Sequence, residues 1–192
     1  MKKYLLSAMI LIAISISAKA QFNFGIKGGV NYSTINSDNL KSSSVAGYQA
    51  GVFARIGGGI YLQPEVYLSS SGGAFTSNDN TYSGNVKFTN LNVPVLVGLR
   101  FGPKNLNFRV MAGPEYISVL SQNQNLSSNF NAAYNNFGNA YKNNQLGYQA
   151  GFGVDLGALT ADLRYQGDFN NYNSYYNQKQ NLWALSVGFK FF

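Results

Sequence analysis

The residues of this chain that could do chemistry are charged side chains that recur along its length. Two of the acids, Asp155 and Asp162, could act as a general acid and a general base. Ion pairs inside the protein explain these aspartates better, because an ion removed from water needs an opposite charge nearby. The candidates comprise six cations and four carboxylates: Lys27, Arg55, Glu65, Arg100, Arg109, Glu115, Asp155, Asp162, Arg164 and Lys190.

The chain contains no histidine and no cysteine, the residues on which many other catalytic and metal sites depend. Ser-His-Asp hydrolases use a histidine base, and transition metals are held mainly by histidine and cysteine. The glycine run at 57–59 is not followed by a helix with a lysine, so it is not a phosphate-binding loop. The sequence therefore predicts a protein that is not an enzyme, with no cofactor and no metal site.

The charged residues lie in segments where apolar and polar side chains alternate. A period of two indicates β-strands, because successive side chains leave opposite sides of a strand. In the hairpin at 146–169, for example, Tyr148, Phe152 and Val154 share one face, and Asp155 lies on the other. Eight strands are expected, at about 22–32, 45–56, 60–69, 87–101, 106–118, 146–156, 159–169 and 182–192.

The distribution of charge between the two strand faces predicts which face is inside. All ten charged candidates lie opposite the apolar face. A soluble sandwich would place apolar residues inside and charges in water. Lipid enforces the reverse, because an Arg or Lys facing the middle of a bilayer costs roughly 2–4 kcal/mol. The pattern predicts an all-β, eight-stranded antiparallel up-and-down transmembrane barrel with a polar lumen filled by side chains.

Two further residue types bear on this barrel. Glycines on the inward face, such as Gly151 and Gly153, would make room for arginine side chains. Pro64, Pro94 and Pro114 lie within three consecutive expected strands. Because proline has no N–H and a closed barrel has no free edge, bulges or gaps in the hydrogen-bond ladder are expected there.

The connections between the strands alternate in length. Tight turns are expected at 57–59, 102–105 and 157–158, and longer Ser- and Asn-rich loops at 33–44, 70–86, 119–145 and 170–181. Outer-membrane barrels have short periplasmic turns and long extracellular loops. The sequence therefore predicts a protein of the cell outer membrane, with its long loops extracellular and its C-terminus periplasmic.

The N-terminal residues, 1–20, are typical of a cleaved signal peptide. Lys2 and Lys3 precede an apolar stretch at 4–16, and Ala18-Lys19-Ala20 matches a cleavage site. Cleavage would leave residues 21–192 as the barrel domain and would lower the net charge from +7 to +4. The remaining basic residues are dispersed, which argues against a nucleic-acid partner.

The long loops contain the plausible recognition surface. One interpretation of their aromatic residues is a platform for a glycan, a peptide or a surface partner. The other, which we favour, is that these rings anchor the loops at the membrane interface or pack over the barrel mouth. The residues are Phe130, Tyr134, Phe137, Tyr141, Tyr172, Tyr175 and Tyr176.

One literal repeat, Gly-Tyr-Gln-Ala-Gly, occurs at 47–51 and again at 147–151. Both copies lie near the start of an expected strand that follows a long loop, and the two strands are four apart. Duplicated halves of the chain would explain the repeat. Convergent strand chemistry is favoured, because the match is single and short.

Five segments together resemble the PorT-like outer-membrane β-barrel family of Bacteroidota, a group of small eight-stranded barrels. The segments are 25–33, 62–67, 91–96, 112–116 and the hairpin at 146–169. The resemblance implies an outer-membrane location, contact with outer-membrane lipid and assembly by the barrel-insertion machinery. It implies no catalytic residues.

Three functions are compatible with these observations. The favoured one is a non-enzymatic integral outer-membrane protein with a structural or surface-interaction role through its long extracellular loops, whose envelope partner or surface ligand the sequence does not name. The second is an accessory component of an outer-membrane secretion or assembly complex, as the family's namesake suggests. The third, a soluble lipocalin-like ligand-binding barrel, requires an apolar interior and is disfavoured by the inward charges.

Overall fold

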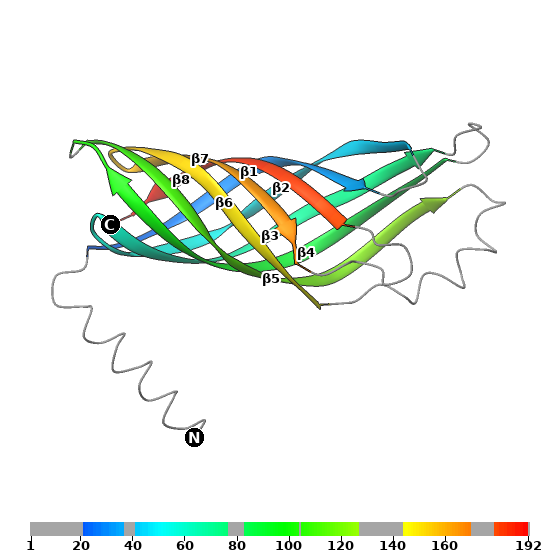
Figure 1. The fold of residues 1–192 in the computed structure, drawn as a ribbon, viewed down its shortest axis with the longest axis horizontal. Helices are drawn as coiled ribbons and strands as arrows, with labels where there is room; N and C mark the ends of the chain where they lie inside the picture. The colour runs from blue at the N-terminus through cyan, green and yellow to red at the C-terminus, as the bar shows by residue number, and fades with distance from the viewer. Residues whose placement is uncertain are drawn as a thin grey trace, which may run out of the picture.

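The structure, a computed structural model, describes residues 21–36, 41–76, 83–103, 105–126, 144–169 and 179–191. These residues form a closed antiparallel barrel in which each strand pairs with the next and β8 pairs with β1 (Figure 1). No helix among the described residues is long and apolar enough to cross a membrane. The eight strands are β1 (Phe22–Asn36), β2 (Lys41–Gly57), β3 (Ile60–Thr76), β4 (Ser83–Phe101), β5 (Leu106–Leu126), β6 (Asn144–Leu156), β7 (Leu159–Asp168) and β8 (Lys179–Lys190).

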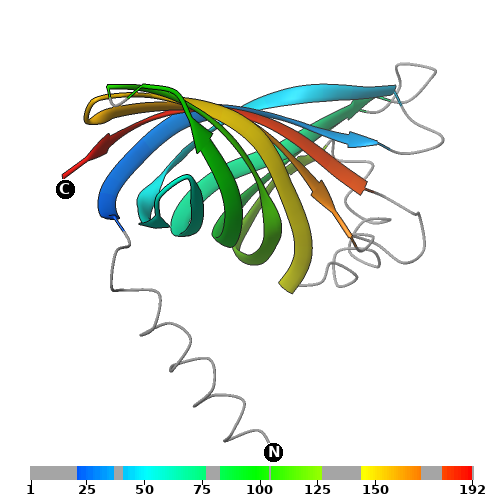
Figure 2. The same ribbon diagram turned by 60° about the vertical axis from the view of Figure 1, so that its left-hand side comes forward.

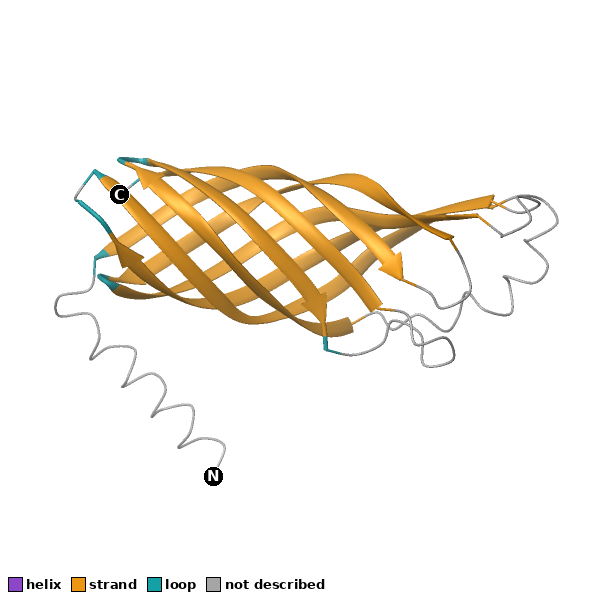
Figure 3. Ribbon diagram, turned by 45° about the horizontal axis from the view of Figure 1, so that its top comes forward, coloured by secondary structure: helices purple, strands orange, loops and turns teal. Residues whose placement is uncertain are grey.

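The order of the strands confirms the predicted fold class. The strands cross the barrel obliquely, as closure of a small sheet requires (Figure 2). The ends of the described chain meet at the short-turn end, where Gly57 N–H donates to the Gln21 carbonyl and Phe191 N–H donates to the Phe24 carbonyl. Figure 3 shows the short turns and the C-terminus at this same end. Gly57 and Gly102, both at φ 127°, allow two of the turns, because side chains disfavour a positive φ.

Side chains alternate between a polar interior and an apolar outer face. In β6, Tyr148 is 37% exposed, whereas the next residue, Gln149, is 3% exposed. Exposed aromatic residues gather near both ends of the outer face, as the aromatic belts at the two interfaces of a membrane-spanning barrel do. The short-turn belt contains Phe22, Phe101, Phe108, Phe189 and Phe191, and the loop-side belt contains Tyr32, Tyr48, Tyr116, Tyr148 and Trp183.

Several strands run further at the long-loop end than the sequence predicts. β3 ends at Thr76, β4 begins at Ser83 and β5 ends at Leu126, so parts of the expected loops at 70–86 and 119–145 are strand. β1, β2 and β8 also extend into expected loops. The extensions are rich in Ser, Asn and Gln. They lack the apolar alternation by which the membrane-embedded segments are recognised.

The three prolines interrupt the ladder without shifting its register. Pairing between β2 and β3 passes from Phe53–Glu65 to Ile56–Leu62, which leaves a gap at Pro64. Equivalent gaps occur between β3 and β4 at Pro94 and between β4 and β5 at Pro114. The expected local gaps are therefore present. Each gap lies between the strand that contains the proline and the strand before it in the sequence. The register shifts of the described wall lie elsewhere, between Ser44 and Gln49 and beside Thr89 and Asn90.

Candidate functional site

The lumen is the candidate site, because most of the predicted charged residues meet there. Eight of the ten are buried, with exposed fractions from 1% for Arg55 to 6% for Lys27. They come from β1, β2, β3, β5, β6 and β7, so the site exists only once the barrel has closed. The eight are Lys27, Arg55, Glu65, Arg109, Glu115, Asp155, Asp162 and Arg164.

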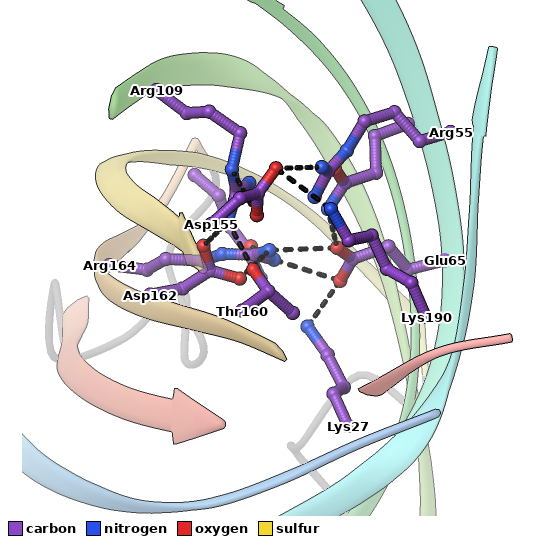
Figure 4. Close-up of polar contacts among 11 residues, drawn as sticks. Lys27, Arg55, Glu65, Arg109, Asp155, Thr160, Asp162, Arg164 and Lys190 are labelled. Carbon is purple, nitrogen blue, oxygen red and sulfur yellow. Dashed lines mark hydrogen bonds and ion pairs between the residues drawn. The ribbon is translucent and has the colours of Figure 1, made fainter. Parts of the chain in front are cut away.

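Asp155 holds three cations near the short-turn end of the lumen. Its Oδ2 lies 2.7 Å from Arg55 Nη1 and 3.3 Å from Lys190 Nζ. Its Oδ1 lies 3.0 Å from Arg109 Nε. Lys190, the ninth predicted residue, is partly exposed at the rim and joins the site through this carboxylate (Figure 4). Strands β2, β5, β6 and β8 are thereby joined through one side chain.

A second set of ion pairs continues from Arg109 across the lumen. Arg109 Nη2 lies 2.6 Å from Asp162 Oδ1, and Arg164 Nη2 lies 2.9 Å from Asp162 Oδ2. Arg164 also makes two hydrogen bonds of 2.8 Å to the Glu65 carboxylate. Lys27 forms an ion pair with the same carboxylate from β1 (Figure 4). Bidentate Arg–carboxylate contact adds geometric specificity to charge neutralisation.

A neutral side chain closes these contacts into a ring. Arg55 Nε donates to Gln63 Oε1 over 2.7 Å, and Gln63 Nε2 donates to Glu65 Oε1 over 2.6 Å. The ring contains three guanidinium groups and three carboxylates, so it is balanced in charge. Leaving one of these ions unpaired in the interior would cost several kcal/mol. The members in order are Arg55, Gln63, Glu65, Arg164, Asp162, Arg109 and Asp155.

Glu115 has different partners from the other carboxylates. Its Oε1 accepts hydrogen bonds from the Tyr67 hydroxyl over 2.6 Å and from Gln149 Nε2 over 2.8 Å. Lys27 lies over the Tyr67 ring, with Nζ 4.4 Å from the ring centroid. Tyr67 and Gln149 are neutral, so the charge pattern of the sequence does not predict them as members of the site. Their inward phase in the alternating strands would have identified them.

Arg100 corrects the predicted set. It shares the inward phase of β4 but is only half-buried, at the short-turn end. Its Nη2 donates to Gln21 Oε1 over 2.7 Å, and the ion pairs between described residues do not include it. Its strand partner is Arg109, which is already bound to Asp155 and Asp162. Arg100 therefore bonds at the rim of the lumen and lies outside the ion-pair network described above.

Inward glycines provide the space that the ring needs. A Cβ at Gly153 would overlap Asp162 Oδ1 and Arg109 Nη2, and one at Gly151 would crowd the backbone and side chain of Arg164. These positions match the expectation that small inward residues make room for arginine. The interior space beside the ring, lined in part by Lys27, Gln49, Tyr67 and Gln149, is too narrow for a water molecule. Side chains therefore fill the lumen at this level.

The loop-side half of the lumen is polar but uncharged at most positions. Asn92 Nδ2 donates to Ser69 Oγ over 2.8 Å, and Asn90 Nδ2 donates to Ser71 Oγ over 2.9 Å, which joins β3 to β4. The described residues contain no group of acids able to hold a metal ion. The aromatic loop residues Phe130, Tyr134, Phe137, Tyr141, Tyr172, Tyr175 and Tyr176 lie outside the described residues.

A closed eight-stranded barrel with an aromatic-belted apolar wall and a charged interior defines a transmembrane β-barrel of the outer-membrane type. Its interior is the reverse of the apolar one that the lipocalin-like alternative requires. The chain belongs to the family described as "Outer membrane protein beta-barrel domain", whose sequence model matches residues 15–174. The protein is therefore an integral outer-membrane β-barrel protein.

Solved structures share this fold at low sequence identity. The Yersinia pestis attachment invasion locus protein Ail, solved with the heparin analogue sucrose octasulfate, is 13% identical (TM-score 0.50, covering 89% of this chain and 99% of Ail). Neisserial surface protein A is 12% identical (TM-score 0.50; 88% and 97%). OprG from Pseudomonas aeruginosa is 14% identical (TM-score 0.53; 88% and 95%). No curated protein sequence matches this chain.

Proposed function

We propose that this protein is a non-enzymatic barrel that is anchored by its wall and makes contacts at the cell surface through its long-loop end. The observation that carries this proposal is the closed ring of ions across the lumen. The ring crosses the lumen, and the space beside it has no room for a water molecule, which supports a barrel that does not pass solutes. The strands that extend beyond the loop-side aromatic belt instead provide surface outside the membrane.

The proposed orientation places the long loops outside the cell and the short turns with the C-terminus in the periplasm. It is supported by the usual arrangement of outer-membrane barrels. The chain contains no cysteine, so single cysteines can report this orientation without background. Ser83→Cys, at the loop-side start of β4, should react with a membrane-impermeant maleimide on intact cells. Gly58→Cys, in a short turn, should react only after the outer membrane has been opened. The reverse labelling pattern would overturn the proposal.

Reconstitution tests the closed lumen separately. Purified full-length protein in planar bilayers should produce no steady ion conductance, whereas a porin added to the same bilayers should conduct. A sustained conductance from this protein, lost on heating to unfold it, would contradict a closed barrel and favour a transport function.

A second candidate function is an accessory role in a secretion or assembly complex. It is favoured by the five segments that resemble the PorT-like family, and we propose membership of that family on the same residues. We also propose that residues 1–20 are removed as a signal peptide and that the barrel-insertion machinery places the protein in the outer membrane. N-terminal sequencing of protein from outer membranes should begin at Gln21. Crosslinking should recover stoichiometric envelope partners if the accessory role is correct.

A further inference from the structure

The outer face of the barrel has a hollow in the membrane-embedded part of its wall. Its floor is made by Ala112 on β5 and Ala150 on β6, which are both exposed and are paired with each other across the two strands. The hollow has a volume of about 540 Å³, within the roughly 300–1,000 Å³ that is usual for ligand sites. Bulkier outward side chains surround the floor: Val97, Val110, Phe152, Leu163, Tyr165 and Trp183.

The floor of the hollow lies between the two aromatic belts. On β6, Tyr148 of the loop-side belt is two residues from Ala150, and on β5, Phe108 of the short-turn belt is four residues from Ala112. At about 3.3 Å per residue, these separations are roughly 7 Å and 13 Å along the strands. The floor therefore faces the hydrocarbon of the bilayer. An empty hollow there would forfeit the dispersion contacts of its lining, so an apolar group fills it.

The width of the hollow favours a single hydrocarbon chain. Val97 pairs with Ala112, and Ala150 pairs with Tyr165, so the floor lies between β4 and β7. Neighbouring strands are about 4.8 Å apart, so roughly 14 Å separate the β4 and β7 backbones before the side chains of Val97 and Tyr165 narrow the space. A transmembrane helix with its side chains is about 10–12 Å across and would rest on these flanks. A flexible acyl chain is narrow enough to reach the alanines.

Aromatic rings border the hollow towards the loop side. The rings of Tyr165 and Trp183 lie 5.2 Å apart, and the Tyr148 ring lies 6.3 Å from that of Tyr165. The Tyr165 hydroxyl donates to Asn181 Oδ1 over 2.9 Å, which fixes this ring beside the floor. Rings of such a belt lie at the depth of the lipid headgroups, where acyl chains begin. A chain on the alanine floor is thus contacted by Phe152 as well as by Tyr165 and Trp183.

We propose that the hollow over Ala112 and Ala150 binds one straight acyl chain of a lipid in the loop-side leaflet. Contact with the floor and with both flanks favours a chain in the hollow over a chain that touches the wall on one side only. Methyl branches widen a chain and lift it from the floor, so straight chains are selected over branched ones. The inference adds a lipid site to the proposed surface role and requires only that the wall faces lipid.

Trp183 reports which lipid occupies the hollow, because it lines the hollow and is the sole tryptophan of the chain. The folded full-length protein is placed in vesicles of diphytanoyl phosphatidylcholine, whose chains are methyl-branched. These vesicles contain a small mole fraction of straight-chain phosphatidylcholine that is brominated near the headgroup end of its chains. Quenching of Trp183 should correspond to about three-fold more brominated lipid than its mole fraction. Quenching that matches the mole fraction would overturn the inference.

Matched substitutions locate this preference. Ala150→Leu should fill the floor and reduce the enrichment to the mole fraction. Ala50→Leu should retain the enrichment, because Ala50 is exposed on the outer wall at the same place in the other copy of the Gly-Tyr-Gln-Ala-Gly repeat, four strands away. Ala112→Leu fills the same floor from β5 and replaces Ala150→Leu if that variant does not fold. Enrichment that survives filling of the floor would contradict the assignment.

A second copy of this chain is the other apolar occupant that the experiment separates. The chain contains no cysteine, so Ala150→Cys introduces a single one into the floor. In vesicles at a high ratio of lipid to protein, a bifunctional maleimide should produce no dimer of this variant. A dimer from Ala150→Cys and not from Ala50→Cys would overturn the lipid assignment. Loss of the lipid preference would leave the labelling of Ser83→Cys unchanged, so the lipid site and the surface orientation can fail separately.

Discussion

Arg55 and Asp155 form an ion pair of 2.7 Å that joins β2 to β6, four strands apart in the closed barrel. Each is the fourth residue after its own copy of the Gly-Tyr-Gln-Ala-Gly repeat. The repeat thus places opposite charges at matching positions of two distant strands. A second match, Val-Gly-x-Arg/Lys-Phe, occurs at 97–101 in β4 and at 187–191, spanning the end of β8, again four strands apart. Both matches therefore relate segments that lie four strands apart in the barrel.

Asp155→Asn should destabilise the barrel more than any single loss of a cation that binds Asp155. The substitution removes the counter-charge of Arg55, Arg109 and Lys190 together. Breaking a buried ion pair from one side typically costs about 3–5 kcal/mol. The urea midpoint of unfolding in detergent, read by heat-modifiable gel migration, measures the loss. Arg55→Met is the comparison, because it leaves Asp155 with two cations; an equal or larger loss in Arg55→Met would contradict the ranking.

The alternation of side chains was sufficient to predict the eight strands, the closed fold class and the inward face of the charges. It could not predict which charges meet, because Glu65 and Arg164 are 99 residues apart and their contact depends on the register of several intervening strand pairs. The outer parts of β3, β4 and β5 were missed for a different reason. They leave the lipid, so neither face is required to be apolar. Arg100 was predicted to join the network because alternation places it on the inward face. Alternation does not show how far along the barrel axis a residue lies, and Arg100 lies at the rim.

Gly153→Ala should weaken the ion-pair ring directly. Its added Cβ would occupy the space of Asp162 Oδ1 and Arg109 Nη2, so this ion pair must shift. Overpacking of this kind costs about 1–3 kcal/mol. Gly58→Ala is the matched control, because nothing lies within 4 Å of a Cβ built there. The urea midpoint should fall for Gly153→Ala and stay near that of the wild type for Gly58→Ala. Equal midpoints for the two variants would show that the ring accommodates the added Cβ without loss of stability, which would contradict the prediction.

Pro114→Ala should stabilise the barrel modestly. The new N–H can donate across the gap between β4 and β5, where pairing passes from Pro94–Glu115 to Val97–Ala112. A hydrogen bond contributes about 0.5–1.5 kcal/mol net, against roughly 0.4–1 kcal/mol lost through a more flexible unfolded chain. Pro103→Ala, in the turn after β4, loses proline rigidity and fills no gap. The urea midpoint of Pro114→Ala should therefore exceed that of Pro103→Ala, and the opposite order would mean that the gap does not limit stability.

Trp183 should report the depth of the loop-side aromatic belt. It is the sole tryptophan of the chain, it is 53% exposed on the outer wall, and its ring lies 5.2 Å from that of Tyr165. Tryptophans of such belts lie at the headgroup level. In vesicles containing brominated lipids, bromine near the headgroup should quench Trp183 fluorescence more strongly than bromine near the end of the acyl chain. Trp183→Phe supplies the background signal. Stronger quenching by bromine near the end of the acyl chain would show that Trp183 lies near the bilayer centre. No quenching by either lipid would contradict a lipid-facing wall.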